Sequence, residues 1–415
     1  MMASVAHARL GGTALVVAMC LAMAASLLGF SAFGAITPAL IGEWGLSKTE
    51  AGWLNGIFFV GYMIGVPSLV GGTDRIDARL VFLVGCVLSA LSLAGLALAT
   101  GFWSAMAFRV LGGIGFAGCY MPGLKALVDR YEGSHPSRAV SFYTASYAIG
   151  AGASFWLSGV IAAELGWRWA FWITLAGPLA GLALAAWTLR PLGMPSKLAD
   201  WFRIPDFRPV FSNRPAMGYI VAYTLHTGEL FVFLSWVVAF LTFAAAMHPA
   251  GSAGWDIPLI SAIVTVVALP SSIIGNEIAI RFGRRRTILV VMMATALVAA
   301  GTGFSAALSF PAAAFMCLLY GTIIATDSSA LTAGTVGAAR PDERGATMAL
   351  HSFLGFGGGA VGPLILGVTL DLTGGGETVA SWGIGFAVIA ALTLIGPPVL
   401  LRLVGRETPA PVMAG

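Results

Sequence analysis

The sequence is dominated by apolar stretches that contain no charged side chain and have the length of a membrane-crossing helix. Seven of them span residues 10–42, 51–73, 139–163, 169–189, 257–276, 345–370 and 378–401. A helix needs about 20 mostly apolar residues to cross a hydrocarbon core about 30 Å thick, whereas about 10 tilted residues serve a barrel strand. These stretches therefore predict membrane-spanning helices and not barrel strands.

Three longer apolar regions each carry a single charged residue. Residues 80–121 divide at Thr100-Gly101, residues 287–339 divide near Ser309-Phe310-Pro311, and residues 215–246 contain one acid, Glu229. With two spans in each of the first two regions, the chain is predicted to cross the bilayer twelve times. Only 10% of the side chains are charged, against about 25% in soluble domains, so a soluble multidomain enzyme is excluded.

The basic residues predict the orientation of these spans. When the loops are assigned alternately to two sides, 18 of the 22 basic residues fall on one side, and only Lys48 and Arg168 fall on the other. Short loops rich in lysine and arginine stay on the cytoplasmic side. We therefore expect a multi-pass protein of the inner (cytoplasmic) membrane with both termini in the cytoplasm. The net charge of +4 reports this topology and requires no nucleic acid partner.

The two halves of the chain resemble each other. A shift of 206 residues places Arg75 on Arg281, Arg79 on Arg285 and Arg138 on Arg344 without a gap. Parallel six-helix repeats of this kind form two bundles about an axis along the membrane normal. The predicted domains are an N-terminal bundle at 1–189, a cytoplasmic linker at 190–214, a C-terminal bundle at 215–403 and a cytoplasmic tail at 404–415.

Several motifs resemble those of the major facilitator superfamily. Residues 72–79 read GTDRIDAR and residues 281–286 read RFGRRR, and both resemble the loop signature G-x-x-x-D-R-x-G-R-R. Residues 109–117, RVLGGIGFA, are similar to the motif R-x-x-x-G-x-G-x-A, and residues 166–171, GWRWAF, match the common entry to the sixth span. The resemblance covers essentially the whole chain. It implies an all-α membrane protein with two parallel-repeat six-helix bundles around a central cavity.

The loop signature departs from the family at some positions. Val70 and Asp77 stand where the family has glycines, and Ile280 stands at the acidic position of the second loop, with Glu277 about one turn earlier. In the family, a contact between an acid and an arginine of this loop locks the bundles, and here Asp74 and Arg75 are the better candidates for it. The gating residues implied by the resemblance are Asp74, Arg75, Arg79, Arg281, Gly283 and Arg285.

Glycine and proline in two spans bear on the direction of transport. The antiporter motif G-x-x-x-G-P-x-x-G lacks its proline between Gly150 and Gly159, which argues against a drug/proton exchanger. A similar arrangement occurs in the eleventh span, at residues 358–363, GGAVGP. There Pro363 either breaks the helix where the bundles rock, or serves tight packing together with the glycines.

Six ionisable residues fall within the predicted spans, where charge is costly. They are Arg109, Lys125, His226, Glu229, Asp327 and His351. An ionisable group at the bilayer centre costs at least about 2.5–3.5 kcal/mol, so each one is a functional-site hypothesis. The resemblance implies that spans one, four, seven and ten line the cavity, and five of the six residues lie on these spans.

Two carboxyls, Glu229 and Asp327, are placed near the middle of the membrane by their positions in the seventh and tenth spans. Desolvation favours the neutral form of a carboxyl, a property needed to take up a proton on one side and release it on the other. His226 lies one helical turn before Glu229 on the same face. The pair either relays a proton or forms a permanent contact that holds helices together.

Arg109 stays protonated at any depth. It either holds a carboxylate substrate in a bidentate grip or neutralises Glu229 or Asp327 across the cavity. Lys125 lies sixteen residues further along the fourth span and either extends towards water or contacts substrate.

The remaining candidates are aromatic or lie near a span end. His351 is predicted to be a satisfied histidine at the membrane interface. Tyr320, like Tyr223, Phe231 and Trp236, either stacks on a planar substrate or packs between helices.

These residues predict a secondary transporter that works by alternating access. A small organic solute binds between Arg109 and the carboxylates Glu229 and Asp327, and its movement is coupled to protons in a symporter or antiporter. Import of an organic anion or metabolite and export of drugs or toxic amphipathic compounds are both open, and a non-transporting membrane sensor is the alternative from another class. The chain has no ATP-binding loop G-x-x-x-x-G-K-[ST]. We expect a monomer in the lipid bilayer, with no enzymatic activity, cofactor, metal site or nucleic acid partner.

Overall fold

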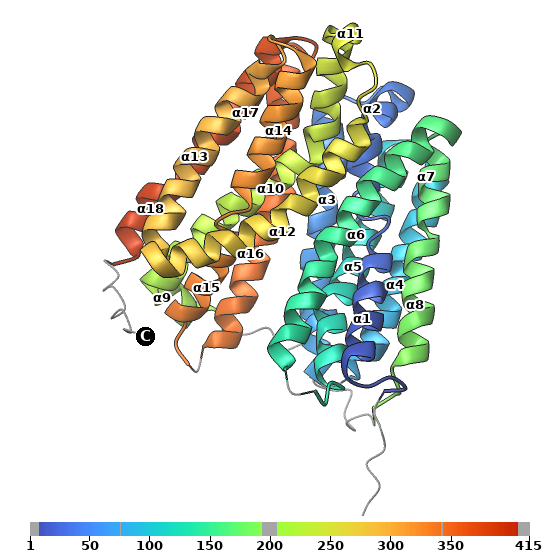
Figure 1. Ribbon diagram of the computed structural model, residues 1–415, viewed down its shortest axis with the longest axis vertical. Coiled ribbons are helices and arrows are strands. Elements are labelled where there is room, and N and C mark those ends of the chain that lie inside the picture. The colour runs from blue at the N-terminus through green and yellow to red at the C-terminus, as the bar shows by residue number, and fades with distance from the viewer. Residues whose placement is uncertain (1–7, 75, 134, 193–205, 342, 406–415) are drawn as a thin grey trace, which may run out of the picture. The chain divides into compact units, whose positions relative to one another are not determined.

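The computed structural model describes residues 8–74, 76–133, 135–192, 206–341 and 343–405, and their regular structure is helical apart from an isolated bridge between Ala8 and Leu189 (Figure 1). The chain divides into two compact units. Unit 1 holds Met1–Ile204, Leu234–Thr242 and Gly254–Val266, and unit 2 holds Pro205–Phe233, Phe243–Ala253 and Val267–Gly415. The predicted domain boundaries stay predictions, and much of the linker at 190–214 and of the tail at 404–415 lies outside the described residues.

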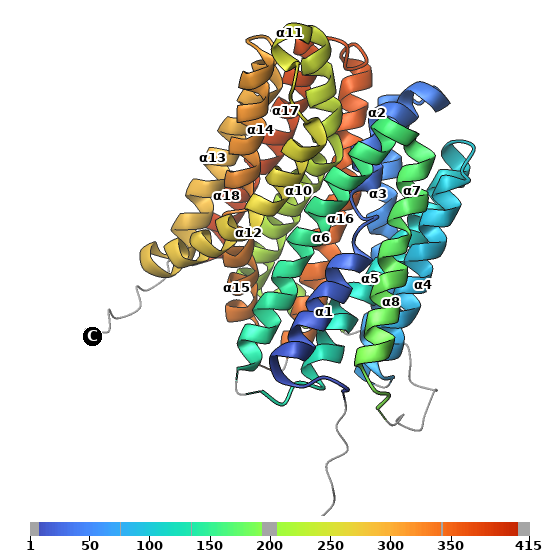
Figure 2. The ribbon, with the colours of Figure 1, turned by 45° about the vertical axis from the view of Figure 1, so that its right-hand side comes forward.

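The first eight α-helices form the main part of unit 1. They are α1 Gly12–Ser26, α2 Ala32–Trp44, α3 Lys48–Gly65, α4 Ala78–Ala97, α5 Phe102–Val128, α6 Pro136–Leu165, α7 Trp167–Thr174 and α8 Ala176–Thr188, with the short π and 3-10 turns Val66–Val70 (η1) and Gly71–Asp74 (η2) after α3. α1 lies beside α8, and α4 beside α5 (Figure 2). A capping box begins α3, in which Ser47 accepts from the Glu50 backbone N–H and donates its own N–H to the Glu50 side chain.

Glycines let the helices of unit 1 approach closely. A Cβ added to Gly113 of α5 would lie 1.8 Å from the Phe58 carbonyl oxygen of α3, and one added to Gly85 of α4 would lie 2.7 Å from the Gly118 carbonyl carbon of α5. Small residues at such crossings strengthen van der Waals packing where water supplies no hydrophobic driving force. The glycine-rich sequence of residues 109–117 is thus explained by the packing of α5.

The remaining helices contain the elements of unit 2, although residues 234–242 of α10 and 257–266 of α12 group with unit 1. They are α9 Arg208–Ser212, α10 Arg214–Met247, α11 Pro249–Ser252, α12 Ile257–Phe282, α13 Arg284–Ser305, α14 Phe310–Ile324, α15 Ser328–Ala338, α16 Arg344–Leu372, α17 Val379–Thr393 and α18 Gly396–Leu403. α13 packs against both α14 and α17. A Cβ on Gly358 of α16 would lie 2.2 Å from the Thr224 carbonyl oxygen of α10, so these two helices are also joined by close glycine packing.

Eleven segments of the described residues are long and apolar enough to cross a membrane, and α1 is a shorter apolar helix. The difference from the predicted twelve spans arises in the first span. Residues 10–42 carry no charge, but they form two helices, α1 and α2, with a break at Leu27–Ser31. The stretch that holds the first predicted span therefore consists of two successive helices.

The break between α1 and α2 keeps its backbone groups hydrogen-bonded. The Leu27 N–H donates to the Ala24 oxygen at 3.2 Å and the Phe30 N–H to the Leu27 oxygen at 2.8 Å. The Ser31 N–H donates to the Ser154 hydroxyl of α6 at 3.0 Å. Non-helical backbone at membrane depth is tolerated where protein surrounds it, and here α6 provides that cover.

Substitution of Gly113 by alanine tests the close packing of α3 and α5. The added Cβ would collide with the backbone of Phe58, and overpacking of this kind costs about 1–3 kcal/mol. We expect Gly113→Ala to lower the melting temperature of the purified full-length protein in detergent. Gly42→Ala is the matched control, because Gly42 lies in α2 with nothing within 4 Å of the added Cβ. An unchanged melting temperature for Gly113→Ala would contradict the packing.

Candidate functional site

A buried histidine and a buried aspartate are in direct contact in unit 2. The Nδ1 atom of His226 on α10 lies 2.9 Å from Oδ1 of Asp327, and each side chain is only 2% exposed. The other ring nitrogen of His226, Nε2, is buried and has no hydrogen-bond partner among the described residues. One ring nitrogen of His226 therefore lies against the Asp327 carboxyl, while the other nitrogen has no hydrogen-bond partner among the described residues.

Asp327 stands where the predicted tenth span is broken. α14 ends at Ile324 and α15 begins at Ser328, with Asp327 as the N-cap residue of α15. The Asp327 carbonyl accepts from the Leu331 N–H at 2.8 Å. A carboxylate near a helix N-terminus is stabilised by about 0.3–1 kcal/mol through the helix dipole. Discontinuous membrane helices typically mark ion and substrate sites in transporters.

α12 supports this break from the side. A Cβ on Gly275 of α12 would lie 1.7 Å from the Thr326 carbonyl oxygen, so only glycine allows this approach. The hydroxyls of Ser272 and Ser329 are 2.6 Å apart, and the Ser329 N–H donates to the Ser272 hydroxyl at 3.3 Å. The interrupted backbone is thus enclosed and hydrogen-bonded by its neighbour.

A second buried carboxyl lies on the same helix as His226. The Tyr320 hydroxyl of α14 donates to Oε1 of Glu229 on α10 at 2.8 Å. Glu229 is 4% exposed and Tyr320 is fully buried. We call His226, Glu229, Tyr320 and Asp327 the polar cluster.

The geometry of the polar cluster corrects the pairing considered from the sequence. His226 and Glu229 were expected to pair with each other along one helix face. Instead, each makes its polar contact with the broken helix: His226 with Asp327 and Glu229 with Tyr320. Tyr320, which sequence reasoning left between stacking on a substrate and packing, is a hydrogen-bond donor to a buried acid.

His351 of α16 is buried and not interfacial as predicted. The Thr335 hydroxyl is 3.1 Å from its Nδ1 and the Thr332 hydroxyl is 3.4 Å from its Nε2. Its ring stacks on Tyr223 with a centroid distance of 3.8 Å, and Tyr223 also stacks at 6.0 Å on His226. The histidine is satisfied, as expected, but it extends the buried polar region from the polar cluster towards α16.

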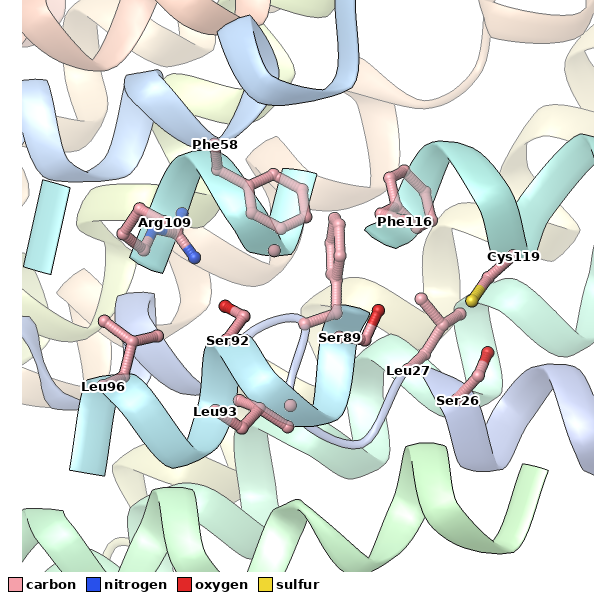
Figure 3. A pocket seen from close by; sticks show the side chains of 13 residues that line it. Ser26, Leu27, Phe58, Ser89, Ser92, Leu93, Leu96, Arg109, Phe116 and Cys119 are labelled. Atoms are coloured by element: carbon pink, nitrogen blue, oxygen red, sulfur yellow. The ribbon is translucent and has the colours of Figure 1, made fainter. Parts of the chain in front are cut away.

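Arg109 is buried in unit 1, with 6% of its surface exposed. Its Nε donates to the Leu54 carbonyl at 2.8 Å and its Nη2 to the Asn55 carbonyl at 3.1 Å. The guanidinium carbon lies 4.8 Å and 4.6 Å from the ring centroids of Phe33 and Phe58. Arg109 forms no ion pair with any carboxylate of the described residues. It also borders a pocket within unit 1 (Figure 3).

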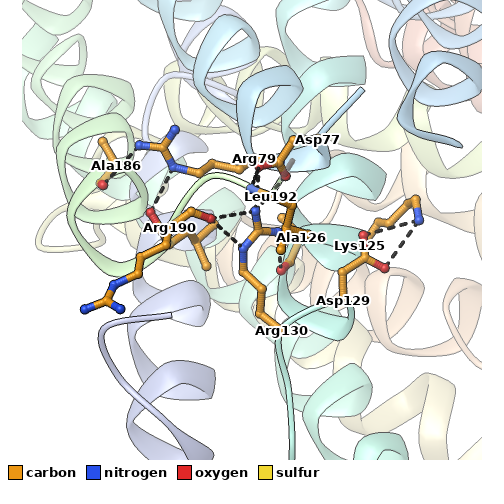
Figure 4. A network of polar contacts seen from close by, with 10 residues as sticks. Asp77, Arg79, Lys125, Ala126, Asp129, Arg130, Ala186, Arg190 and Leu192 are labelled. Carbon is orange, nitrogen blue, oxygen red and sulfur yellow. Dashed lines mark hydrogen bonds and ion pairs between the residues drawn. The ribbon is translucent and has the colours of Figure 1, made fainter. Parts of the chain in front are cut away.

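Lys125 lies away from these buried groups. Its side chain is 36% exposed, and Nζ is 3.3 Å from Oδ2 of Asp129, one turn further along (Figure 4). Of the two interpretations from the sequence, extension towards water is the one that this geometry favours.

The loop residues predicted to gate the protein are described only in part. Arg75 lies outside the described residues, and only the backbone of Asp74 is described. Arg79 donates through Nε to the Leu189 carbonyl at 2.9 Å and through Nη2 to the Ala186 carbonyl at 3.2 Å. These bonds hold the start of α4 to the end of α8 within unit 1.

The acid of this loop that makes the strong contact is Asp77, which stands where the family has a glycine. Both carboxylate oxygens of Asp77 accept from Nη2 of Arg130, at 2.6 and 2.7 Å (Figure 4). Asp77 also accepts the Leu192 N–H at 2.8 Å, and Arg130 donates to the Arg190 carbonyl. Arg130 is one of the 18 basic residues on the predicted cytoplasmic side, and the sequence has no signal that links it to Asp77.

The equivalent loop of unit 2 uses glycine for its backbone geometry. Gly283 has a φ of +93° between α12 and α13, a conformation that side chains other than glycine rarely adopt. Arg281 is exposed at the end of α12, and Nη2 of Arg285 lies 3.4 Å from the Leu401 carbonyl. The backbone conformation of the loop therefore explains why glycine stands at position 283. The gating role of Arg281 and Arg285 stays a prediction.

The family model described as Major Facilitator Superfamily matches residues 19–363. The chain belongs to the major facilitator superfamily. A solved structure of a bacterial homolog of the human lysosomal transporter Spinster, in an inward-facing and occupied conformation, has a similar fold. Its TM-score is 0.76 at 16% identity, with 96% of this chain and 99% of that chain covered.

Curated members of the superfamily with similar sequences include two from Acinetobacter baylyi. The niacin transporter NiaP is 29% identical over 139 residues, which cover 33% of this chain and 31% of that protein. The benzoate transport protein is 30% identical over 154 residues, covering 34% of this chain and 31% of that protein. The chain thus spans about a third of the length of these relatives. With the apolar segments above, these findings establish a multi-pass membrane protein of this superfamily.

Substitution of Asp77 tests the loop contact in this superfamily member. Burial raises the pKa of Asp77, but hydrogen bonds from Arg130 and from the N–H groups of Leu192 and Arg79 outweigh it, so the pKa lies below its ordinary value. A depressed carboxyl pKa stabilises the folded state above the unfolded pKa of about 3.9, and this stabilisation is lost as the pH falls through the folded pKa. We expect Asp77→Asn to cost about 3 kcal/mol at pH 7.

The measurement is the melting temperature of wild type and Asp77→Asn in detergent between pH 3 and pH 8. Their difference is expected to be largest at neutral pH and to shrink as the pH falls below about 4. Asp129→Asn is the matched control, since its exposed pair with Lys125 is worth less than about 1 kcal/mol. A difference that is the same at every pH would contradict the assignment to Asp77.

Proposed function

We propose that this superfamily member is a secondary transporter that imports a small organic anion together with protons by alternating access. The observation that carries the proposal is the polar cluster, which brings two carboxyls and one imidazole together at a helix break within a predicted membrane span. Buried ionisable groups of this kind are costly and usually belong to ion or proton pathways.

The charges of the polar cluster favour the uptake of a proton. With His226 protonated and both Glu229 and Asp327 ionised, the three groups carry one excess negative charge. An uncompensated charge buried in low dielectric costs several kcal/mol. Binding of one proton removes this excess, and release of the proton restores it, so the polar cluster has two states that differ by one charge.

The proposal of an anionic substrate is supported by Arg109. A buried guanidinium without a carboxylate partner among the described residues favours a ligand that brings its own negative charge. Two relatives, the niacin transporter NiaP and the benzoate transport protein, are each named for a small ring-containing acid. We extend this substrate class to the present chain.

Proton symport also meets an energetic requirement of anion import. An anion that enters a cell works against the inside-negative potential, at about 2.3 kcal/mol per charge per 100 mV. A proton that moves with the anion cancels this charge and adds the free energy of the pH gradient. The proposed place of this import is the inner membrane, with both chain termini in the cytoplasm and the protein acting as a monomer.

Proton-driven efflux of amphipathic compounds is the alternative function. Its main support in the sequence, the glycine-rich stretch before Pro363, is explained by helix packing. A Cβ on Gly362 would lie 2.6 Å from the Gly228 carbonyl oxygen, and one on Gly359 would lie 2.6 Å from the Phe231 ring. The glycines before Pro363 are thus required by contact between α16 and α10. Nothing in this arrangement favours an exchanger over a symporter.

Uptake into proteoliposomes tests proton coupling. With radiolabelled nicotinate and a gradient of two pH units, acidic outside, an electroneutral one-proton symport supports accumulation of up to about 100-fold. We expect the wild type to accumulate nicotinate, and Glu229→Gln to bring it only to equal concentrations on both sides while retaining partial exchange. Asp327→Asn is expected to lose accumulation as well.

Protein-free liposomes measure passive entry, and Asp129→Asn is the matched carboxyl control outside the polar cluster. Wild-type uptake that ignores the imposed gradient would remove the proton role. Accumulation by Glu229→Gln at the wild-type level would sink the assignment of Glu229. Nicotinate expelled in exchange for protons would favour efflux.

A further inference from the structure

A group of arginines lies in unit 2 where the end of α12, the start of α13 and the end of α18 come together. Arg281 is near the end of α12, and three arginines follow in the first turn of α13. Figure 1 shows α18 next to α13, and Nη2 of Arg285 lies 3.4 Å from the Leu401 carbonyl of α18. We call Arg281, Arg284, Arg285, Arg286 and Arg402 the basic patch.

The charge of the basic patch has no acidic partner in the part of the chain that the structure describes. Each of its arginines except Arg285 lacks both an ion pair and a side-chain hydrogen bond to a described residue. The acid closest in sequence, Glu277, is exposed one helical turn before Arg281 and forms no such ion pair either. The basic patch therefore holds positive charge that the described residues leave uncompensated.

The corresponding loop of unit 1 compensates its charge internally. Both carboxylate oxygens of Asp77 accept from Nη2 of Arg130. The shift of 206 residues between the two halves of the chain places Gly283 at the position of Asp77 and Ile280 at the position of Asp74. The loop of unit 2 thus has arginines but neither of these acids. A partner from outside the chain can supply the missing negative charge.

The three arginines at the start of α13 lie where a helix favours negative charge. The positive end of the helix dipole is located there, so cations are unfavourable in the first turn. The N-cap residue, Gly283, makes no side-chain hydrogen bond, and the first turn contains no acid. An anion beside this turn offsets both the dipole and the mutual repulsion of the arginines.

Exposed apolar side chains beside the basic patch indicate that this anion belongs to a lipid. Ile280 and Phe282 flank Arg281 and are 62% and 64% exposed, and Leu401, which precedes Arg402, is 51% exposed. A soluble phosphate would contact only the arginines, whereas a phospholipid offers a charged headgroup and acyl chains together. Clusters of about four to eight basic residues at the cytoplasmic end of a membrane helix are typical of binding to anionic lipids.

We propose that the basic patch binds the headgroup phosphate of an anionic phospholipid, whose acyl chains lie against Ile280, Phe282 and Leu401. The predicted orientation of the spans places this lipid in the cytoplasmic leaflet. The binding goes beyond the proposed function. It requires the chain to lie in a bilayer, and neither the polar cluster nor Arg109 takes part in it.

Native mass spectrometry of the purified full-length protein in a neutral detergent tests the proposal, with phosphatidylglycerol as the probe. A titration gives the apparent Kd of the first bound lipid. Phosphatidylcholine has the same phosphate and acyl chains but no net charge, and we expect it to bind at least about tenfold more weakly. Glycerol 3-phosphate has the phosphate without acyl chains, and at about ten times the lipid concentration we expect it to leave the lipid bound.

Two double variants locate the binding. Arg281→Gln/Arg286→Gln removes two exposed arginines of the basic patch and is expected to weaken phosphatidylglycerol binding about 25-fold, from about fivefold for each arginine. Arg9→Gln/Arg344→Gln is the matched control, because it removes the same charge from exposed arginines outside the basic patch. We expect its affinity to stay within about twofold of wild type. None of the four side chains has a partner among the described residues, so melting temperatures equal to wild type are expected.

Three results would each overturn the proposal. They are equal affinity for phosphatidylglycerol and phosphatidylcholine, equal loss of affinity in the two double variants, and displacement of the lipid by glycerol 3-phosphate, which would assign a site for soluble phosphates. Selective phosphatidylglycerol binding that is weakened by Arg281→Gln/Arg286→Gln and not by the control supports the proposal, whether or not the protein accumulates nicotinate. Failure of the lipid site is therefore distinguishable from failure of the proposed function.

Discussion

The cost of an ionised group in hydrocarbon determines where the polar residues of this protein are found. At least about 2.5–3.5 kcal/mol is lost when one is left unmatched at the centre of a membrane. The chain meets this cost in two ways. At the membrane edge, Asp77 and Arg130 compensate each other fully. Within the spans, Arg109 has aromatic rings and carbonyls but no described carboxylate, and the polar cluster has two acids for one histidine.

Two of the helix breaks, the one between α1 and α2 and the one between α14 and α15, follow from the same constraint. An interrupted helix exposes backbone groups that must find partners inside the protein. In each break, a serine of a neighbouring helix accepts a backbone N–H: Ser154 accepts from Ser31 in unit 1, and Ser272 accepts from Ser329 in unit 2. Each break also lies beside one of the incompletely compensated charges, Arg109 in the first case and Asp327 in the second. At these two breaks, irregular backbone and an incompletely compensated charge occur together.

The sequence predicts the helices well because the absence of charge over about 20 residues has one main physical solution in a bilayer. It also identifies Arg109, His226, Glu229 and Asp327 as buried, since their cost is a property of position along a span. It does not predict their partners. A spacing of three places His226 and Glu229 on one face, but which neighbouring helix meets that face is decided by tertiary packing.

The breaks were similarly invisible to sequence reasoning. Residues 325–327 contain neither glycine nor proline, and residues 27–31 contain only Gly29, so neither stretch has a strong helix-ending signal. The contact of Asp77 with Arg130 was missed because it joins residues 53 positions apart. Such pairings require knowledge of which helix ends meet, and the chain's charge pattern reports only the side of the membrane on which they lie.

The uncompensated charges have opposite signs in the two units, and this has a consequence for coupling under the proposed function. Unit 1 holds one cation without a described carboxylate, so an anion completes it. The polar cluster of unit 2 has one carboxyl more than it has imidazole, so a proton completes it. A protein loaded with only one of the two ligands keeps a buried charge that costs several kcal/mol, whereas joint loading removes both. If the change between the outward-facing and inward-facing states is slow whenever one of these charges is uncompensated, the protein changes state with the anion and the proton bound together. Symport requires this joint movement.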